Sequence, residues 1–187
     1  MQSYIQTTCE SCLASCLLFA VNELIPVRIV DHEHACLFHA LTFSKDDFAM
    51  GHVDYITTHF PVAINRLVDS DPFAQYLGLL SLPRHSMVSV VPITVDHIKS
   101  CVNQGYQPIV YLDDYDLLPY NHCPHFVVVT GYDRDRITIM DPWNGLIKDI
   151  HGKVLEHAIT SLKRRLYFCP QILLVSKRTA PIMEVSA

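Results

Sequence analysis

The sequence lacks the excess of basic residues that nucleic-acid-binding chains carry. Its 187 residues include 14 lysines and arginines against 19 aspartates and glutamates, so the formal net charge is −5 with neutral histidines. A chain of this charge offers no broad positive surface to phosphates, and nucleic acid is excluded as an expected partner. The short basic run Lys163-Arg164-Arg165 falls on an expected helix and is interpreted as its solvated face.

A long hydrophobic run is also missing. The most apolar stretch, from Cys12 to Val21, is too short to cross a bilayer and is followed by Asn22 and Glu23. The residues before it lack the basic start and the cleavage site of a secretory signal. There is no repeat or low-complexity linker, and half of the residues are hydrophobic. We therefore expect one cytoplasmic domain over residues 1–187, without a membrane span.

The cysteines do not form a disulfide framework. Their number, seven, is odd, and three of them crowd into residues 9–16. Cys9 and Cys12 have the Cys-x-x-Cys spacing, but no second pair repeats it as a zinc ribbon would. The thiols are therefore expected to be reduced, and neither a metal nor another cofactor is expected.

The order of the expected elements indicates an α+β fold. Hydrophobic periodicity and helix start and stop signals predict helices at residues 12–24, from Asp71-Pro72 onward, at 94–105 and at 154–166. A further short helix is expected from Pro61, and a short extended piece at 26–30. β-branched runs predict strands at 87–93, 108–112, 126–130, 137–140 and 172–175. A helical N-terminal half should therefore pack against an antiparallel-rich sheet.

Three residue types in chain order suggest nucleophilic catalysis. Cys12 opens the apolar run, so its thiol should lie at a helix N-terminus, where the dipole favours the thiolate. His125 and then Asp141 follow far downstream, in strands of the expected sheet. Cysteine, histidine and acid in this order supply a nucleophile, a base and an orienting group. This pattern predicts a papain-like cysteine peptidase acting on a peptide or protein.

A predicted hairpin brings His125 toward Asp141. The turn signal lies at residues 132–135, between two β-branched runs. A hairpin centred on Arg134 sets residue 127 opposite Asp141, whereas one centred on Asp133 sets His125 itself opposite Asp141. Directly opposed residues share a face of the sheet, and a slip of one residue sends one of them to the other face. The sequence leaves both registers open, and the second is the one that would pair the two side chains directly.

Three segments resemble a known family. Gln6-x5-Cys12-x-Ala-Ser-x-Leu, His125-Phe-Val-Val-Val-Thr-Gly-Tyr-Asp and Asp141-Pro-Trp-Asn-Gly are similar to motifs of the bacteriocin-processing peptidases that remove double-glycine leaders. The resemblance covers residues 6–20 and 105–145 and is weak over 31–85. It implies a papain-like fold, a precursor-peptide substrate and a transporter or precursor peptide as partner.

The resemblance also implies a role for each matching residue. Cys12 would be the nucleophile, His125 the base and Asp141 the residue that orients His125, while Gln6 would help to form the oxyanion hole. One position departs from the family, because Leu13 stands where glycine usually follows the nucleophile. A backbone N–H can still donate to an oxyanion there, and the larger side chain is expected to narrow the cleft.

Several competing interpretations remain open. Cys16 is one turn into the apolar run and is expected in the core, and Cys9 is close in sequence to Gln6. The cluster His32-x-His34-x-Cys36-x-x-His39 could bind zinc if the first two histidines shared a strand face, and His122-Cys123-x-His125 looks metal-like too. Asp113-Asp114-x-Asp116 suggests calcium but is better explained as a solvated turn. A peptide-binding module, a thiol acyltransferase and a metal-binding protein are the alternative functions.

Overall fold

The computed structural model describes residues 4–43, 47–118 and 121–178. Six α-helices occur in these ranges: α1 (Cys12–Leu24), α2 (Ile29–Phe43), α3 (Phe48–His59), α4 (Asp71–Leu79), α5 (Val95–Asn103) and α6 (Gly152–Arg165). The strands are β1 (Val62–Val68), β2 (Ser86–Val90), β3 (Ile109–Asp113), β4 (Pro124–Asp133), β5 (Arg136–Asp141), β6 (Leu146–His151) and β7 (Gln171–Lys177). A 3-10 turn, η1 (Asp114–Asp116), follows β3.

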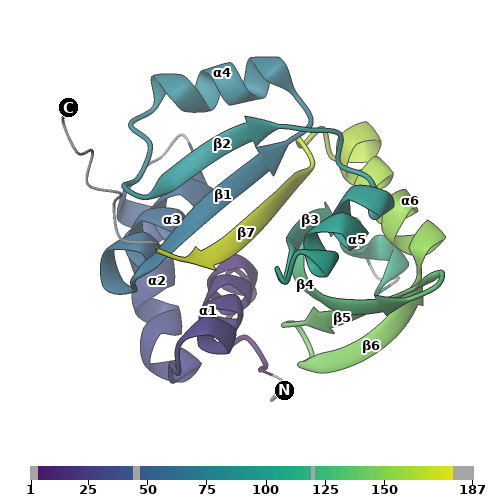
Figure 1. The fold of residues 1–187 in the computed structure, drawn as a ribbon, viewed down its shortest axis with the longest axis horizontal. Coiled ribbons are helices and arrows are strands. Elements are labelled where there is room, and N and C mark those ends of the chain that lie inside the picture. Colours follow the sequence, from purple (N-terminus) through teal and green to yellow (C-terminus); the bar gives the residue numbers. More distant parts are fainter. Residues whose placement is uncertain (1–3, 44–46, 119–120, 179–187) are drawn as a thin grey trace, which may run out of the picture.

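The seven strands form one mixed sheet in the order β2-β1-β7-β3-β4-β5-β6. Five of the six strand pairs are antiparallel, and the edge pair of β1 and β2 is parallel. The last strand, β7, lies between β1 and β3, so it joins an early part of the chain to the later hairpins (Figure 1). The fold is thus α+β, as predicted, and is consistent with a papain-like architecture.

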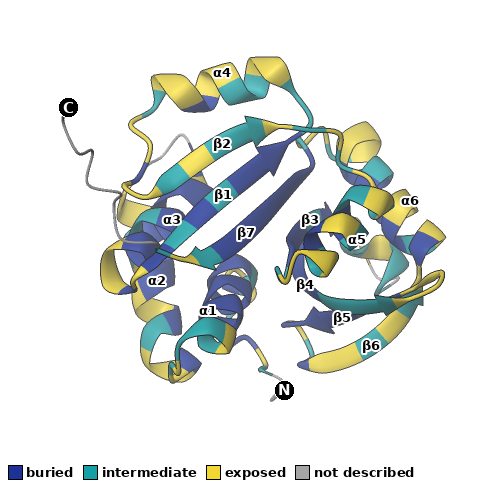
Figure 2. Ribbon diagram, viewed as in Figure 1, coloured by how far each residue is buried: buried dark blue, intermediate teal, exposed yellow. Residues whose placement is uncertain are grey.

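The helices cover the sheet in two groups. One apolar core forms between α1–α3 and the sheet, and a second forms beneath α5 and α6. Figure 2 shows dark, buried colour along α1, β1 and β7, and exposed colour on the outer elements α4 and β6. Helix α1 is buried along nearly its whole length, because every residue from Leu13 to Val21 is apolar or small and faces neighbouring elements. Its first residue, Cys12, is therefore held in a fixed place.

Several sequence-based expectations for the elements are confirmed. The helix at 12–24 and the helix starting at Asp71-Pro72 are present, and Ser70 caps the latter by accepting from the Phe73 N–H. Thr94 caps α5 as expected by accepting a hydrogen bond from the His97 N–H. Gly105, just after this helix, takes a φ of 85°, a conformation that favours glycine.

Three segments differ from the expectation. The piece at 26–30 is not extended throughout, because α2 begins at Ile29. Pro61 precedes strand β1 rather than a helix, and polar residues such as Arg66 within this strand obscured its pattern. The edge strand β6 was not expected; it is largely exposed, and its apolar residues do not alternate regularly with polar ones.

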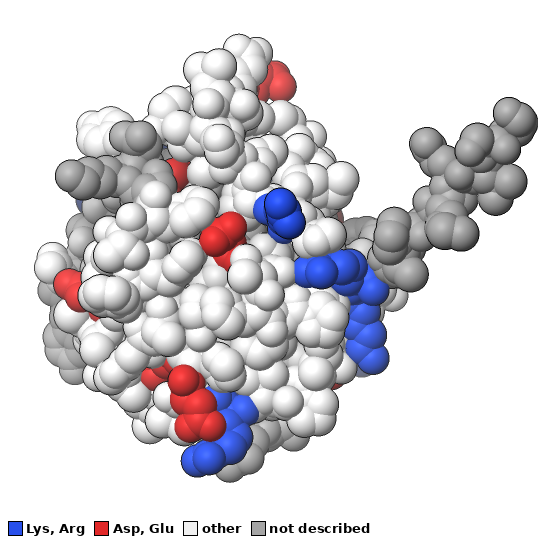
Figure 3. Space-filling model, turned by 90° about the vertical axis from the view of Figure 1, so that its left-hand side faces the viewer, with Lys and Arg blue, Asp and Glu red and all other residues white. Residues whose placement is uncertain are grey.

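Charge is sparse on the surface of the helical side. Figure 3 views the molecule from the left-hand side of Figure 1 and shows a few scattered acidic and basic groups with no broad basic patch. Within the described ranges, no helix combines the length and the apolar character that a bilayer-spanning segment needs.

Candidate active site

Helix α1 presents Cys12 at its N-terminal end. The thiol is half-buried there, whereas Cys9 is exposed in the preceding turn and Cys16 is completely buried one turn further into the helix. The Cys16 thiol donates to the Phe126 carbonyl at 3.3 Å, and burial raises its pKa well above the usual value. Cys16 is thus a core residue, as its position in the apolar run predicted. Cys12 is the one of the three that combines a helix N-terminus with access to solvent.

His125 and Asp141 form a buried pair. The His125 Nε2 lies 2.9 Å from the Asp141 Oδ1, and the two residues are only 3% and 0% exposed. Pro124 begins β4 and Asp141 ends β5, so both side chains lie at the same end of the hairpin. The Asp141 Oδ1 also accepts from the Trp143 N–H at 3.1 Å. These two bonds hold the carboxylate in one orientation toward the imidazole.

A β-bulge puts these two residues on one face of the sheet. Near the turn the pairs are Asp133↔Arg136, Tyr132↔Ile137 and Gly131↔Thr138, and beyond it they are Val129↔Ile139 and Val128↔Met140. Thr130 is the extra residue between these two registers. Continuing the second register sets Asp141 opposite Val127, with His125 two residues along on the same face. Without the bulge Asp141 would face Val128, on the other side of the sheet.

The expected hairpin is therefore corrected in its register. A hairpin centred on Asp133, which would set His125 directly opposite Asp141, is wrong. The alternative centre at Arg134 describes the pairing beyond the bulge, and it makes His125 and Asp141 diagonal neighbours. Asn144, another residue that could have oriented the ring, instead accepts from the Leu146 N–H in the turn after β5.

The charges of three side chains are coupled at this site. Burial alone lowers the pKa of His125, but the hydrogen bond with Asp141 and the influence of the nearby Cys12 thiol and Asp141 carboxylate raise it to about 10. Burial raises the pKa of Asp141, but the bond from His125 and the nearby Lys148, whose Nζ is 3.4 Å from Oδ2, lower it overall. Because Nε2 is committed to Asp141, Nδ1 is the ring nitrogen that remains for the Cys12 thiol.

Gln6 lies beside the strand end that carries Asp141. Its backbone N–H donates to the Pro142 carbonyl at 2.8 Å, and Gly145 of the same turn packs against Ile5. Gly145 has a φ of 66°, and a Cβ there would lie 2.5 Å from the Ile5 side chain, so glycine is needed at this position. The buried Gln6 amide donates to the Thr8 carbonyl at 2.7 Å. A side-chain amide has two N–H groups, so one is left for a ligand.

Glu33 is the residue of this region that the sequence analysis missed. It is fully buried on α2 and accepts four hydrogen bonds, from the Tyr4 hydroxyl at 2.5 Å, the Thr7 N–H at 2.8 Å, the Ser11 hydroxyl at 2.5 Å and the Ser15 hydroxyl at 3.1 Å. Burial raises the pKa of Glu33, but these bonds lower it overall. One carboxylate thus ties the segment that carries Gln6 to the start of α1.

A sequence signal for Glu33 did exist. Helix α2 buries Ile29, Glu33, Cys36, Leu37 and Ala40, which recur at helical spacing on one face. An acid on the apolar face of a helix indicates a buried carboxylate with several donors. The zinc interpretation considered a shared strand face for His32 and His34 and did not take this helical pattern into account.

The histidine cluster of α2 has other partners. His32 Nδ1 lies 3.0 Å from the Tyr55 hydroxyl, His34 contacts the Thr7 hydroxyl at 2.5 Å and His39 pairs with Asp54 at 2.9 Å. They lie on a helix, so the shared strand face considered for zinc does not exist. In the part of the chain that the structure describes, no three His, Cys, Asp or Glu side chains group as a metal site would require.

The acidic run after β3 is only partly a solvated turn. Asp113 is fully buried and accepts from the Ser161 hydroxyl, and it pairs with His122 at 2.7 Å. This corrects the interpretation of Asp113 as a solvated residue, since its carboxylate anchors α6 to β3. Asp116 lies at the surface side of the turn and pairs with His157 at 2.6 Å. His122 is thus engaged by Asp113 and takes no part in a metal cluster with His125.

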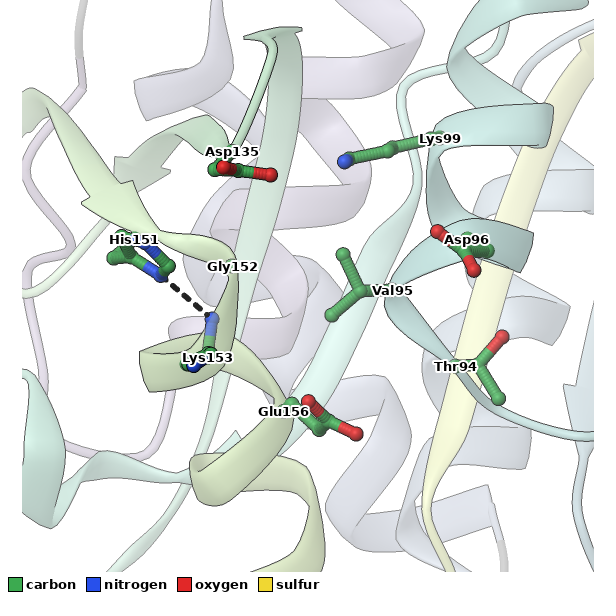
Figure 4. Close-up of a pocket in the computed structure, with 9 residues that line it drawn as sticks. All are labelled: Thr94, Val95, Asp96, Lys99, Asp135, His151, Gly152, Lys153 and Glu156. Atoms are coloured by element: carbon green, nitrogen blue, oxygen red, sulfur yellow. Dashed lines mark hydrogen bonds between the residues drawn. The ribbon is translucent and has the colours of Figure 1, made fainter.

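Two pockets lie on different sides of the sheet. A surface pocket of about 480 Å³ is lined by residues of α5, α6 and the nearby turns, including Lys99, Lys153, Asp96, Asp135 and Glu156 (Figure 4). It carries both charge signs and contains none of the residues of the candidate triad. A second pocket, of about 250 Å³, is lined by Leu13 and Phe126, which directly follow Cys12 and His125 in sequence. The second pocket is the one nearer Cys12, which packs against the same apolar cluster as Leu13 and Phe126.

Comparison with known families gives a match to one part of the chain. A model of the Peptidase_C39 like family matches residues 82–162, which is less than half of the chain. The matched segment contains His125 and Asp141 and ends before the last strand, and it does not extend to Cys12 or Gln6. The chain is thus related to C39-like peptidases, without being assigned to the bacteriocin-processing branch. No curated protein matches the chain.

Replacing Asp141 by asparagine should lower the pKa of His125 and, with it, the pH above which peptide turnover declines. The carboxylate stabilises the protonated imidazole, so its loss lowers the pKa of His125 from about 10. We expect the alkaline loss of activity to move down by about 1 to 3 pH units, because an adjacent carboxylate contributes a shift of that size. The pH dependence of turnover, with a parallel titration of His125 by NMR, measures this shift. Asp133→Asn, at an exposed position of the same hairpin, should leave both curves unchanged.

Replacing Glu33 by alanine should destabilise the protein by about 2–4 kcal/mol, because it leaves several donors without their charged acceptor. The pKa of Glu33 is lower in the folded state than the unfolded-state pKa near 4.5. The ionised carboxylate therefore stabilises the fold fully above the unfolded-state pKa, and this stabilisation is lost as the pH falls through the folded-state pKa. Urea unfolding at pH 7 and at pH 3 measures both effects. Glu23→Ala, at an exposed position of α1, is the matched control and should cost much less.

Proposed function

We propose that this chain is a papain-like cysteine peptidase. The observation that carries the proposal is the buried pair of His125 and Asp141, joined at 2.9 Å, together with Cys12 at the start of α1, near enough to His125 to raise the pKa of its imidazole. The relationship to C39-like peptidases supports the same class of reaction. Removal of a leader from a precursor peptide is the proposed substrate role, as the resemblance of the motifs around Cys12, His125 and Asp141 to bacteriocin-processing peptidases implies.

The proposed reaction begins with the ion pair of Cys12 and His125. The thiolate attacks the carbonyl carbon of the scissile peptide bond, and the oxyanion accepts from the Gln6 amide and the Cys12 backbone N–H. This N–H lies in the first turn of α1, where backbone donors have no partner within the helix. His125 then donates its proton to the leaving amine, the C–N bond breaks and a thioester remains on Cys12.

The second half of the reaction releases the acyl group. His125, now neutral, takes a proton from water while the oxygen attacks the thioester carbonyl carbon. The C–S bond breaks and the thiolate of Cys12 is restored beside the imidazolium. If an amine or a thiol replaces water, the same steps give acyl transfer. Product analysis with an added amine therefore separates the peptidase from a thiol acyltransferase.

Alkylation should identify Cys12 as the nucleophile. Cys16 is buried, and Cys12 is the cysteine of this segment that influences the pKa of His125, so iodoacetamide should modify Cys12 first at mildly acid pH. Cys12→Ala should abolish both this labelling and turnover, whereas Cys9→Ala should change neither. Mass spectrometry of the labelled peptides is the measurement. Preferential labelling of Cys9, or a Cys12 no more reactive than free cysteine, would leave a peptide-binding module as the better function.

Gln6→Ala should lower kcat by about 10²–10³, as the loss of one oxyanion donor does in other hydrolases. KM should stay near its starting value, because the interaction exists only in the transition state. Steady-state kinetics on a cleaved peptide separates the two constants. A raised KM with an unchanged kcat would instead make Gln6 a substrate contact.

A further inference from the structure

The pocket beside Cys12 has an aromatic and apolar lining. Its volume is about 250 Å³, and its walls come from helices and strands distant in sequence: Leu13, Asp47, Phe48, Ala49, Arg66, Phe73, Tyr111, Phe126, Phe168 and Gln171. Tyr111 stacks on Phe126 with a centroid separation of 4.3 Å. Two lining side chains, Phe48 and Phe168, are 39% and 45% exposed, so large apolar groups are open to an incoming ligand.

The pocket lies near the nucleophile. Leu13 follows Cys12 directly, and Cys12 and Tyr111 both pack against the apolar cluster that contains Leu13 and Phe126. Burial, followed by the charges of Cys12 and other nearby groups, raises the pKa of Tyr111. A peptide held with its scissile carbonyl at Cys12 therefore has a neighbouring side chain within reach of this pocket.

The polar residues of the lining bind one another. Arg66 is 5% exposed; its Nε donates to the Gln171 Oε1 at 2.7 Å and its Nη2 to the Asp47 Oδ2 at 2.9 Å. The guanidinium also lies over the Phe73 ring, 5.5 Å from its centroid. The charge of Arg66 is thus balanced within the wall by Asp47. A charged ligand gains little from such a wall, and an apolar side chain suits the remaining lining.

We propose that this pocket binds a large apolar side chain, preferably aromatic, of one of the two residues that precede the scissile bond. The proposal rests on the peptidase function above and specifies its substrate. An apolar protein cavity of about 150 Å³ holds benzene, so a pocket of this size admits an aromatic ring. A double-glycine sequence, by contrast, places no side chain here and leaves the apolar walls in water. The pocket therefore indicates cleavage beside a bulky residue rather than after two glycines.

Peptide chloromethyl ketones that alkylate Cys12 test this preference. We would compare acetyl-Phe-Gly, acetyl-Gly-Phe and acetyl-Gly-Gly probes and measure the rate of Cys12 modification by mass spectrometry. One of the phenylalanine probes should react roughly tenfold faster or more than the diglycine probe, since even one methylene in an apolar pocket changes specificity by about that factor. Equal rates, or a faster diglycine probe, would overturn the proposal.

Matched variants locate the preference in the pocket. Phe168→Ala and Phe48→Ala remove exposed parts of the lining and should reduce the preference for phenylalanine about fivefold or more. Tyr167→Ala is the control, because Tyr167 is adjacent in sequence, 88% exposed and outside the pocket. Iodoacetamide, which carries no such side chain, should react equally with all of these proteins. A preference that survives both lining variants would place the recognition elsewhere and overturn the assignment.

A binding measurement separates failure of this proposal from failure of the peptidase function. Calorimetry with Cys12→Ala protein should show tighter binding of acetyl-Phe-Gly and acetyl-Gly-Phe amides, or of one of them, than of acetyl-Gly-Gly amide. Loss of that difference in Phe168→Ala supports the pocket even if the wild-type protein cleaves no peptide. If Cys12 is reactive but the three peptides bind equally tightly, the peptidase proposal stands and the pocket proposal is refuted.

Discussion

The candidate active site depends on the way in which the start of α1 is held against the start of β4. The Cys16 thiol donates to the Phe126 carbonyl, and these two residues lie one helical turn from Cys12 and one residue from His125. Around this bond α1 is packed with apolar side chains on nearly every side. A shift of the helix would break a buried hydrogen bond and open voids in a close-packed core, both of which are costly. The separation of thiol and imidazole is therefore determined by the core.

Buried charges around this core are each matched by partners. Asp141 has His125, the Trp143 N–H and Lys148, and Glu33 has three hydroxyls and a backbone N–H. An ionised group without such partners would be too costly to bury, so these carboxylates hold their surroundings in fixed orientations. Glu33 acts in this way on the segment that carries Gln6, and Asp141 acts on the ring of His125. Preorganised groups of this kind lose little energy to rearrangement when a reaction proceeds.

The same packing shapes the neighbourhood of the thiol. Leu13, which follows the candidate nucleophile directly, is only 1% exposed and packs into the core. Its outer surface forms part of the aromatic pocket together with Phe126 and Tyr111. Strand β7 brings Gln171 into this wall from the C-terminal part of the chain, because it enters the sheet between β1 and β3.

The sequence by itself determined the helix that begins at Cys12, the β-branched strands around His125 and Asp141, and the α+β class, because these depend on local hydrophobic periodicity and turn residues. It missed β1, because the buried polar residue Arg66 finds its partners only in the folded chain. It also missed the edge strand β6, which is largely exposed. Only the tertiary structure decided the register of the hairpin, since the bulge at Thr130 selects the face that Asp141 occupies. It alone also revealed the partners of Glu33 and the aromatic pocket, because both are assembled from segments that are distant in sequence and meet only when the core closes.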